Sequence, residues 1–240
     1  MALGQNRRVP AAADDQNAPF PVPGLDSRPG DRPWPELDWP PSAGETLAGE
    51  IVELRGADPG RDGARLFRAL DHDPVWTHVA GRPASPAGWS ELLARRIAAG
   101  ALPWVISLRR PAGGLAAGSV VGTSTYGDVS APDARLEIGA TAYHPAAWGT
   151  AVNADAKLVL LSYAFGTLRA GRVQLKTDVR NVRSQRAIAA LGARYEGTLR
   201  RYQRRADGTV RDTAMFAITA EDWPAARAAI ERRRAARLSR

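Results

Sequence analysis

The stretch from 137 to 153 contains the residues best suited to chemistry, because an apolar run that carries Glu137 breaks into small residues and then enters a helix. The first residues of a helix have unpaired backbone N–H groups at the positive end of the helix dipole. Gly149 and Ala151 are small enough to let a phosphate group approach these N–H groups. The stretch therefore predicts an anion-binding loop, although an ordinary strand-to-helix turn has the same pattern.

Glu137 is the candidate general base. Glu137 lies in an otherwise apolar run, and a carboxylate can accept a proton from a substrate directly or through water. Alternation along a strand would place Glu137 on one face with Arg135 and Gly139, where it could equally be an ordinary solvent-facing carboxylate. Both interpretations are open from the sequence alone.

The composition excludes several other kinds of catalytic site. The chain has no cysteine, so it has no thiol nucleophile and no cysteine-bound metal. Three histidines, at 72, 78 and 144, are few for a histidine-built centre, and no metal cofactor is expected. Neither the lysine-bearing phosphate loop of nucleotide enzymes nor the glycine-rich dinucleotide fingerprint is present.

Two kinds of periodicity alternate along the chain and predict the elements that position these residues. Strands are predicted at 51–54, 104–108, 119–124, 135–143, 172–178, 195–205 and 210–218. Helices are predicted at 61–70, 85–100, 153–169 and 181–191. Ser85-Pro86 and Asn181 are typical of helix starts, because their side chains can accept hydrogen bonds from free N–H groups. The order of elements predicts a mixed α/β domain.

The chain divides into three predicted parts. Residues 1–47 contain nine of the 18 prolines and form an extended or disordered leader, although Trp34 and Trp39 could pack against the domain that follows. Residues 48–224 form the folded domain, and residues 225–240 form a basic, solvent-exposed helix end or tail. No apolar stretch approaches the ~20 residues of a membrane span and no secretory signal is recognisable, so a cytoplasmic location is predicted.

Several short motifs occur in one order and at close spacing along the second half of the chain. They are Glu137-Ile-Gly, Trp148-Gly149, Tyr163-Ala-Phe165, Asp178-Val-Arg-Asn181-Val-Arg-Ser184, Leu191-Gly-Ala193, Glu196-Gly-Thr-Leu-Arg200, Gly208-Thr-Val-Arg-Asp212 and Asp222-Trp223-Pro224. Taken together they resemble the GNAT N-acetyltransferases, in particular the RimJ/RimL-like branch. The resemblance is dense from 136 to 224 and looser from 48 to 135.

The resemblance implies a fold and its partners. The fold is the mixed α/β GNAT fold, with a central, splayed, mostly antiparallel sheet of about seven strands and about four flanking helices. Acetyl-CoA would lie where the strands separate, beside an amine acceptor. Membrane and nucleic acid are not expected partners, and the choice between a monomer and a homodimer is open.

The resemblance also implies the cofactor contacts. The pyrophosphate loop of the family, R/Q-x-x-G-x-G/A, corresponds to Ala146-Ala-Trp148-Gly149-Thr150-Ala151, so the basic first position is lost. Phosphate binding would then depend on backbone amides and the helix dipole, or on arginines elsewhere, including the tail. The expected contacts are Ala140, Thr141, Ala142, Trp148, Gly149, Thr150, Ala151, Val152, Asn153, Asn181 and Ser184.

The implied chemistry assigns roles to few side chains. A primary amine has a pKa of about 10.4 and must lose a proton before it can attack a thioester, so Glu137 would be the base. Backbone N–H groups around 140–142 would polarise the thioester carbonyl. The family commonly protonates the leaving thiolate with a Tyr, but position 188 is Ile, so Ser184, Tyr195 or water would have to serve. A helix-capping role is an equally simple explanation of Ser184.

The acceptor would lie near Asp73, Trp76 and His78, although a lone Trp is more often part of a core. The predicted function is acetyl-CoA-dependent N-acetylation of a primary amine by direct attack in a ternary complex. The acceptor could be a protein or peptide N-terminus, a small amine or an amine-bearing antibiotic. The alternative is a GNAT-fold binding module, associated with RNA or the ribosome, that has lost the chemistry.

Overall fold

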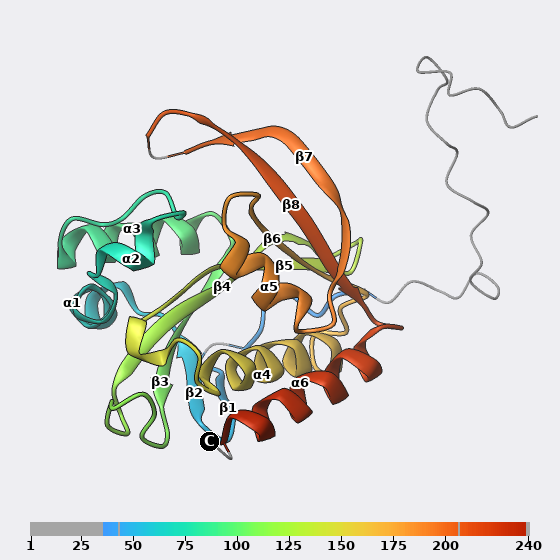
Figure 1. Ribbon diagram of the computed structural model, residues 1–240, viewed down its shortest axis with the longest axis horizontal. Helices are drawn as coiled ribbons and strands as arrows, with labels where there is room; N and C mark the ends of the chain where they lie inside the picture. Colours follow the sequence, from blue (N-terminus) through green and yellow to red (C-terminus); the bar gives the residue numbers. More distant parts are fainter. Residues whose placement is uncertain (1–35, 43, 206, 239–240) are drawn as a thin grey trace, which may run out of the picture. The chain divides into compact units, whose positions relative to one another are not determined.

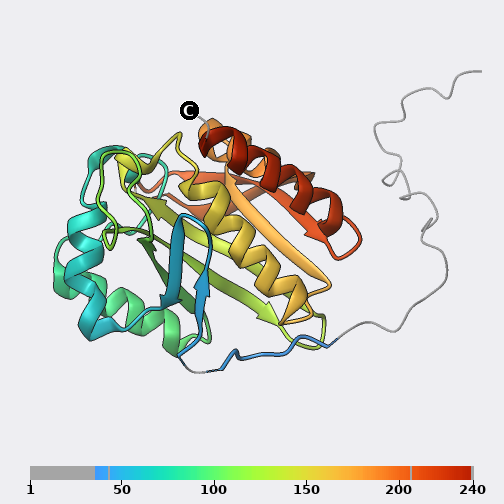
Figure 2. The same ribbon diagram turned by 90° about the horizontal axis from the view of Figure 1, so that it is seen from below.

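The computed structural model describes residues 36–42, 44–205 and 207–238, which build one eight-stranded sheet with helices on both faces (Figures 1 and 2). The strands are β1 (Thr46–Ala48), β2 (Val52–Gly56), β3 (Leu102–Leu108), β4 (Val120–Ser130), β5 (Arg135–Tyr143), β6 (Arg172–Asp178), β7 (Arg194–Arg204) and β8 (Val210–Thr219). The helices are α1 (Pro59–Leu70), α2 (Asp73–Trp76), α3 (Pro86–Ala98), η1 (Pro145–Ala147), α4 (Val152–Gly166), α5 (Val182–Ala189) and α6 (Trp223–Leu238).

The sheet is antiparallel except at its centre. Its order is β1-β2-β3-β4-β5-β6-β8-β7, and only β5 and β6 run parallel. These two strands pair over just three residues each, 135–137 with 172–174, and then separate. The predicted splayed, mostly antiparallel sheet of the GNAT fold is confirmed.

The described residues contain one more strand and two more α-helices than the sequence indicated. The additional strand β1 has three residues and α2 has four, which is too short for either periodicity to be recognised. The long helix α6 was predicted only as a basic helix end or tail, because its inner face is largely alanine and its only buried large residue is Ile230. Alanine favours a helix but contributes a weak hydrophobic pattern.

Two clusters of buried side chains pack on opposite faces of the sheet. On β3, Trp104 and Ile106 belong to the larger cluster, which includes α4 and α6, whereas Val105 belongs to the cluster with α1 and α3. Successive side chains of a strand point to opposite faces, so β3 is covered on both. Figures 1 and 2 show α4 and α6 side by side, apart from the group formed by α1, α2 and α3.

The predicted helix starts are confirmed. The Ser85 side chain accepts a hydrogen bond from Gly88 N–H at 3.1 Å, and the Asn181 side chain accepts one from Ser184 N–H at 3.1 Å. Such caps typically stabilise a helix by about 1 kcal/mol. The second of these caps sets the first turn of α5, which lies at the cavity described below.

The described part of the predicted leader lies against the domain. Leu37 is buried and its N–H donates to the Ala131 carbonyl at 3.2 Å, while Asp38 pairs with Arg169 at 2.8 Å. Trp39 packs edge-on against Tyr126. Strand β1 crosses the predicted boundary at 47/48, and residues 1–35, with Trp34, lie outside the described residues.

Helix α6 is also anchored rather than being a free, solvated end. Its Ala226 and Ile230 are buried, and Trp223 stacks on Phe165 of α4 with ring centroids 5.2 Å apart. The polar face of the helix therefore has a defined orientation relative to α4. Over the described ranges, no helix combines the length and apolar character needed to cross a membrane.

Candidate functional site

A cavity of about 800 Å³ opens where β5 and β6 separate. Eleven of the predicted site residues line it: His78, Glu137, Ala140, Thr141, Ala142, Trp148, Gly149, Thr150, Asn153, Asn181 and Ser184. Four do not: Asp73, Trp76, Ala151 and Val152. The cavity therefore brings the predicted base, loop and α5 residues together, while most of the predicted acceptor contacts lie outside it.

The bulge in β5 explains why the strand leaves its neighbour. The β4–β5 register shifts between Thr123 and Thr125, opposite Gly139 to Ala142, and Ala140 has a left-handed backbone with φ of 46°. That conformation costs an alanine about 1–2 kcal/mol, so the surrounding packing must hold it. A side chain at Gly139 would overlap the Glu137 carboxylate, so this glycine lets the strand approach the carboxylate closely.

Glu137 is buried rather than solvent-facing. Its side chain is 12% exposed, and its Oε2 lies 2.6 Å from Nζ of Lys176 on β6. Burial raises the pKa of Glu137 above 4.5, and the ion pair with Lys176 only partly offsets that effect. A carboxylate with a raised pKa at the edge of a cavity is suited to accept a proton from a substrate.

The loop before α4 is open at its glycine. Gly149 has φ of 75°, and a side chain there would meet no atom within 4 Å. Thr150 Oγ1 accepts from Val152 N–H at 3.2 Å, and the Val152 side chain is fully buried in the larger core cluster instead of lining the cavity. Ala151 provides no side-chain cap for α4, so the helix start keeps backbone donors beside the cavity.

Four arginines line the cavity near this loop: Arg183 and Arg186 of α5, and Arg233 and Arg237 of α6. The Arg183 guanidinium lies over the Trp148 ring, 3.7 Å from its centroid, and Arg237 donates to the Gly149 carbonyl at 2.8 Å. Guanidinium groups are well suited to bind phosphates. They supply positive charge where the loop itself lacks a basic residue.

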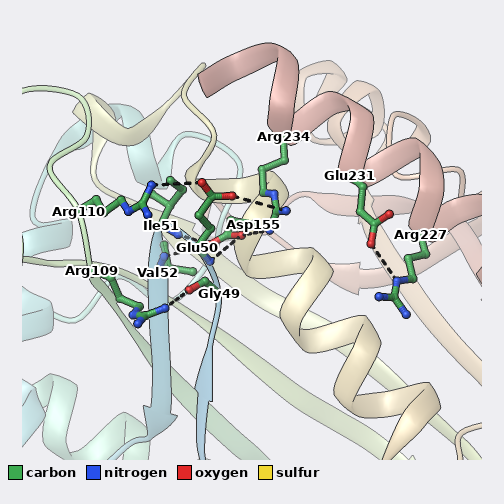
Figure 3. Close-up of polar contacts among 10 residues, drawn as sticks. All are labelled: Gly49, Glu50, Ile51, Val52, Arg109, Arg110, Asp155, Arg227, Glu231 and Arg234. Atoms are coloured by element: carbon green, nitrogen blue, oxygen red, sulfur yellow. Dashed lines mark hydrogen bonds and ion pairs between the residues drawn. The ribbon is translucent and has the colours of Figure 1, made fainter. Parts of the chain in front are cut away.

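Asp155 anchors α6 beside the loop (Figure 3). Its carboxylate is fully buried, accepts from the N–H groups of Ile51 and Val52 at 2.7 and 3.0 Å, and pairs with Arg234 at 2.9 Å. Glu50 contacts the same arginine at 3.6 Å. Removing one partner of a buried ion pair typically costs about 3–5 kcal/mol, so this network stabilises the joined position of β2, α4 and α6.

Lys157 is a cavity residue that the sequence did not indicate. Its side chain is buried, and Nζ lies 2.8 Å from Thr141 Oγ1 and 3.2 Å from Ser124 Oγ. Burial lowers the pKa of Lys157 to about 7. Lys157 and Lys176 are the only lysines of the chain, and both line the cavity. The rarity of lysine in the chain was the one feature of the sequence that could have drawn attention to Lys157.

Of the three predicted acceptor residues, only His78 lines the cavity. Asp73 is exposed and pairs with Arg82 at 2.7 Å. Trp76 packs edge-on against Trp89, and its Nε1 donates to the Leu70 carbonyl at 2.7 Å, so it is a packing residue. Tyr195, one of the predicted proton donors, is 57% exposed and does not line the cavity.

Comparison with known proteins identifies the class. The opened sheet and its flanking helices are those of acetyltransferases with the GNAT fold. A family model described as "Acetyltransferase (GNAT) domain" matches residues 52–194, more than half of the chain. The chain belongs to this family, and its classification as an acetyltransferase is confirmed at that level.

Individual relatives agree with this assignment. The chain is 28% identical over 104 residues, or 43% of its length, to an uncharacterized N-acetyltransferase p20 from Bacillus licheniformis, and the match covers 57% of that protein. A putative acetyltransferase from T. thermophilus is 32% identical with a TM-score of 0.69, over 80% of this chain and 98% of that one. Mycobacterium smegmatis RimJ in complex with CoA-disulfide is 25% identical with a TM-score of 0.68, over 84% and 98%. GNAT acetyltransferases use acetyl-CoA.

Proposed function

We propose that the chain transfers the acetyl group of acetyl-CoA to a primary amine by direct attack in a ternary complex. The observation that carries this proposal is the shared cavity, in which the buried Glu137 carboxylate and the open loop at Gly149 face the same space. Acetyl-CoA supplies the reactive thioester. The similarity to RimJ favours the RimJ/RimL-like branch. The motif resemblance to that branch favours a protein or peptide N-terminus as acceptor.

The arginine group of the cavity would hold the phosphates. Four positive charges lie around the start of α4, from Arg183, Arg186, Arg233 and Arg237. Guanidinium groups would attract a diphosphate by charge and could also donate paired hydrogen bonds to its oxygens. Asn181 and Ser184 line the path between this group and Glu137 along α5. In this arrangement, arginines elsewhere in the chain replace the missing basic residue of the loop. This was one of the two alternatives for phosphate binding that the sequence left open.

Glu137 would accept the proton that the amine loses as its nitrogen bonds to the thioester carbonyl carbon. The carbon–sulfur bond then breaks, and the departing thiolate takes a proton from Ser184 or water. Backbone N–H groups around the bulge at Ala140 would stabilise the negative charge on the carbonyl oxygen. No step needs a cysteine thiol or a metal ion bound by the protein.

The experiment is a coupled measurement on the full chain. Acetyl-CoA should raise the melting temperature, since a ligand that binds only the native state stabilises it, and amines, peptides and ribosomal proteins should be screened for acetyl-CoA-dependent thiol release. Stabilisation without thiol release from any acceptor would instead favour the binding module. If acetyl-CoA causes neither stabilisation nor thiol release, both the transferase and the binding module are ruled out. The cytoplasmic location and the oligomeric state stay predictions.

A further inference from the structure

Two arginines that line the cavity have buried nitrogens without hydrogen-bond partners. They are Arg96 of α3, through Nη1, and Arg211 of β8, through Nε, and both side chains line the same cavity as Glu137. Neither forms an ion pair with another of the residues that the structure describes. Buried donors are nearly always hydrogen-bonded in native proteins, so these two require an explanation.

Several other inward-facing arginines have an acidic partner, including Arg234, whose Nε is also without a hydrogen bond but which pairs with Asp155 at 2.9 Å. Arg205 lies 2.6 Å from the Asp178 carboxylate, and Arg55 forms a bidentate pair with buried Asp62. By contrast, burial lowers the pKa of both Arg96 and Arg211; at Arg211 the charges of Asp178 and Glu137 oppose this effect only in part, and neither acid forms an ion pair with it. A guanidinium stays charged in proteins, so each of the two carries a desolvated positive charge.

The acids nearest to Arg211 are already engaged. Asp178 and Glu137 both act on its charge, but the first is paired with Arg205 and the second with Lys176. Around Arg96, the neighbouring Arg95 adds like charge and lies near Glu91 instead. Neither arginine therefore has an ion-pair partner among the described acids, and an anion from outside the chain could fill that role.

The position of Arg211 distinguishes this anion from the phosphates of CoA. Strand β6 pairs with β8 only up to Thr213, and Arg211 lies just beyond, opposite Gln203 in the part of the β7–β8 hairpin that extends past β6 (Figure 1). Its charge acts on Glu137, the proposed base, whereas the phosphate-binding arginines lie on α5 and α6. An anion bound here would belong to the acceptor.

We propose that the acceptor is a primary amine that also carries a carboxylate, and that Arg211 and Arg96 bind this carboxylate. This inference rests on the proposed function. It disfavours one of the acceptors left open by the sequence, the amine-bearing antibiotic, because the positive charges of a polycationic antibiotic would be repelled by Arg96 and Arg211. The carboxylate could belong to a small molecule or to an acidic residue near a peptide N-terminus. Matched acceptors with and without the carboxylate distinguish these two sources.

The test uses pairs of acceptors that differ only in the carboxylate. Aminovalerate is compared with its amide, and peptides that begin Ala-Glu are compared with peptides that begin Ala-Gln, by thiol release from acetyl-CoA. The carboxylate member of at least one pair should have kcat/KM about tenfold higher, and the pair that shows it identifies the source. Equal rates within both pairs, with an active enzyme, would overturn the proposal.

Variants of the two arginines give the second arm. Arg211→Gln and Arg96→Gln should each raise the KM of the carboxylate acceptor about tenfold, which corresponds to about 1.4 kcal/mol, and leave the KM of acetyl-CoA within about twofold. The controls are Arg204→Gln and Arg95→Gln, since both side chains are exposed and outside the cavity. A preference that survives in both test variants would also overturn the assignment.

A binding readout keeps this inference separable from the proposed function. Aminovalerate at millimolar concentration should raise the melting temperature of the wild type more than its amide does, and should not do so for the double variant of Arg96 and Arg211. If no amine is acetylated but this difference is present, the proposed function fails and the anion site stands. If thiol release is found but carboxylate has no effect in either arm, only the anion site fails.

Discussion

The two ends of the cavity use arginine in opposite ways. At the end formed by α4, α5 and α6, Arg183 lies on the Trp148 ring and Arg237 holds the Gly149 carbonyl. At the end formed by α3 and the β7–β8 hairpin, Arg96 and Arg211 have buried nitrogens without partners. One end is organised by contacts within the chain, and the other is incomplete without a ligand.

This difference follows from what each end would bind. Every acetyl-CoA molecule has the same phosphates, so rigid, pre-positioned donors reduce the ordering cost of binding. An acceptor site gains selectivity from buried polar groups that only the correct ligand satisfies, because a wrong ligand leaves them unpaired. The comparison therefore predicts that changes at one end affect cofactor binding alone and changes at the other end affect acceptor binding alone.

The largest effect is expected where the two ends meet, at Glu137. Glu137→Gln should lower turnover at neutral pH by about 10²–10⁴-fold, the usual contribution of a general base, with acetyl-CoA affinity nearly unchanged. Because burial raises the pKa of Glu137 above 4.5, the wild-type kcat/KM should fall with decreasing pH at a higher pH than for a free Glu. This acid limb should be absent in the variant. Undiminished turnover would remove Glu137 from the mechanism.

The second effect concerns the cofactor end. Gly149→Leu should weaken acetyl-CoA binding by about 100-fold, because the new side chain would project into the open space that the diphosphate would occupy. Gly118→Leu is the matched control, since Gly118 has a similar φ of 83°, equally open surroundings and a position outside the cavity. Calorimetric titration measures the affinity and thermal unfolding measures the shared strain. Equal losses of affinity in both variants would assign the effect to strain.

A third prediction concerns Lys157, which lies between the ends beneath Thr141. Its pKa of about 7 in the folded state is below the value of about 10.4 expected when unfolded. Between pH 8 and 10 the unfolded state therefore binds a proton that the native state does not, and stability rises with pH by about 1.4 kcal/mol per unit. Lys157→Met should lose this slope in urea unfolding. Parallel pH profiles for variant and wild type would mean that Lys157 is charged when folded.

The smallest effect is expected from one arginine of α6. Arg237→Gln should raise the KM of acetyl-CoA about tenfold, equivalent to about 1.4 kcal/mol, and leave the KM of the acceptor unchanged. Arg232→Gln, an exposed change on the same helix, is the control. Steady-state kinetics with each substrate varied in turn provides the measurement. A rise in acceptor KM alone would contradict the division of the cavity into two ends.

The sequence predicted most elements, because their signals are local. The caps at Ser85 and Asn181, and the strand that carries Glu137, depend on residues within a few positions of one another. The short elements β1 and α2 were missed because three or four residues contain no recognisable period. For Trp76 the sequence left an acceptor contact and a core position open, because nothing in its local sequence reveals that Trp89 packs against it.

The sequence indicated cavity residues where a short motif carries them and did not indicate those that only folding brings there. Gly149 and Asn181 belong to short patterns with a backbone reason, whereas the arginines of the cavity are a few among many along the chain. Arg211 and Arg96 are separated by more than a hundred positions, and only folding brings both to one cavity. Lys157 reads as an interruption of an apolar helix face until the packing around it is known.

The sequence by itself determined the alternation of strands and helices, the small-residue loop before α4 and the absence of thiol chemistry, since each depends on residue type and near neighbours. The tertiary structure alone decided which charges are buried and whether they have partners. Electrostatic energy depends on distances between groups and on their exposure to water, and both are set by segments far apart in the chain. The difference between the two ends of the cavity is therefore a property of the fold.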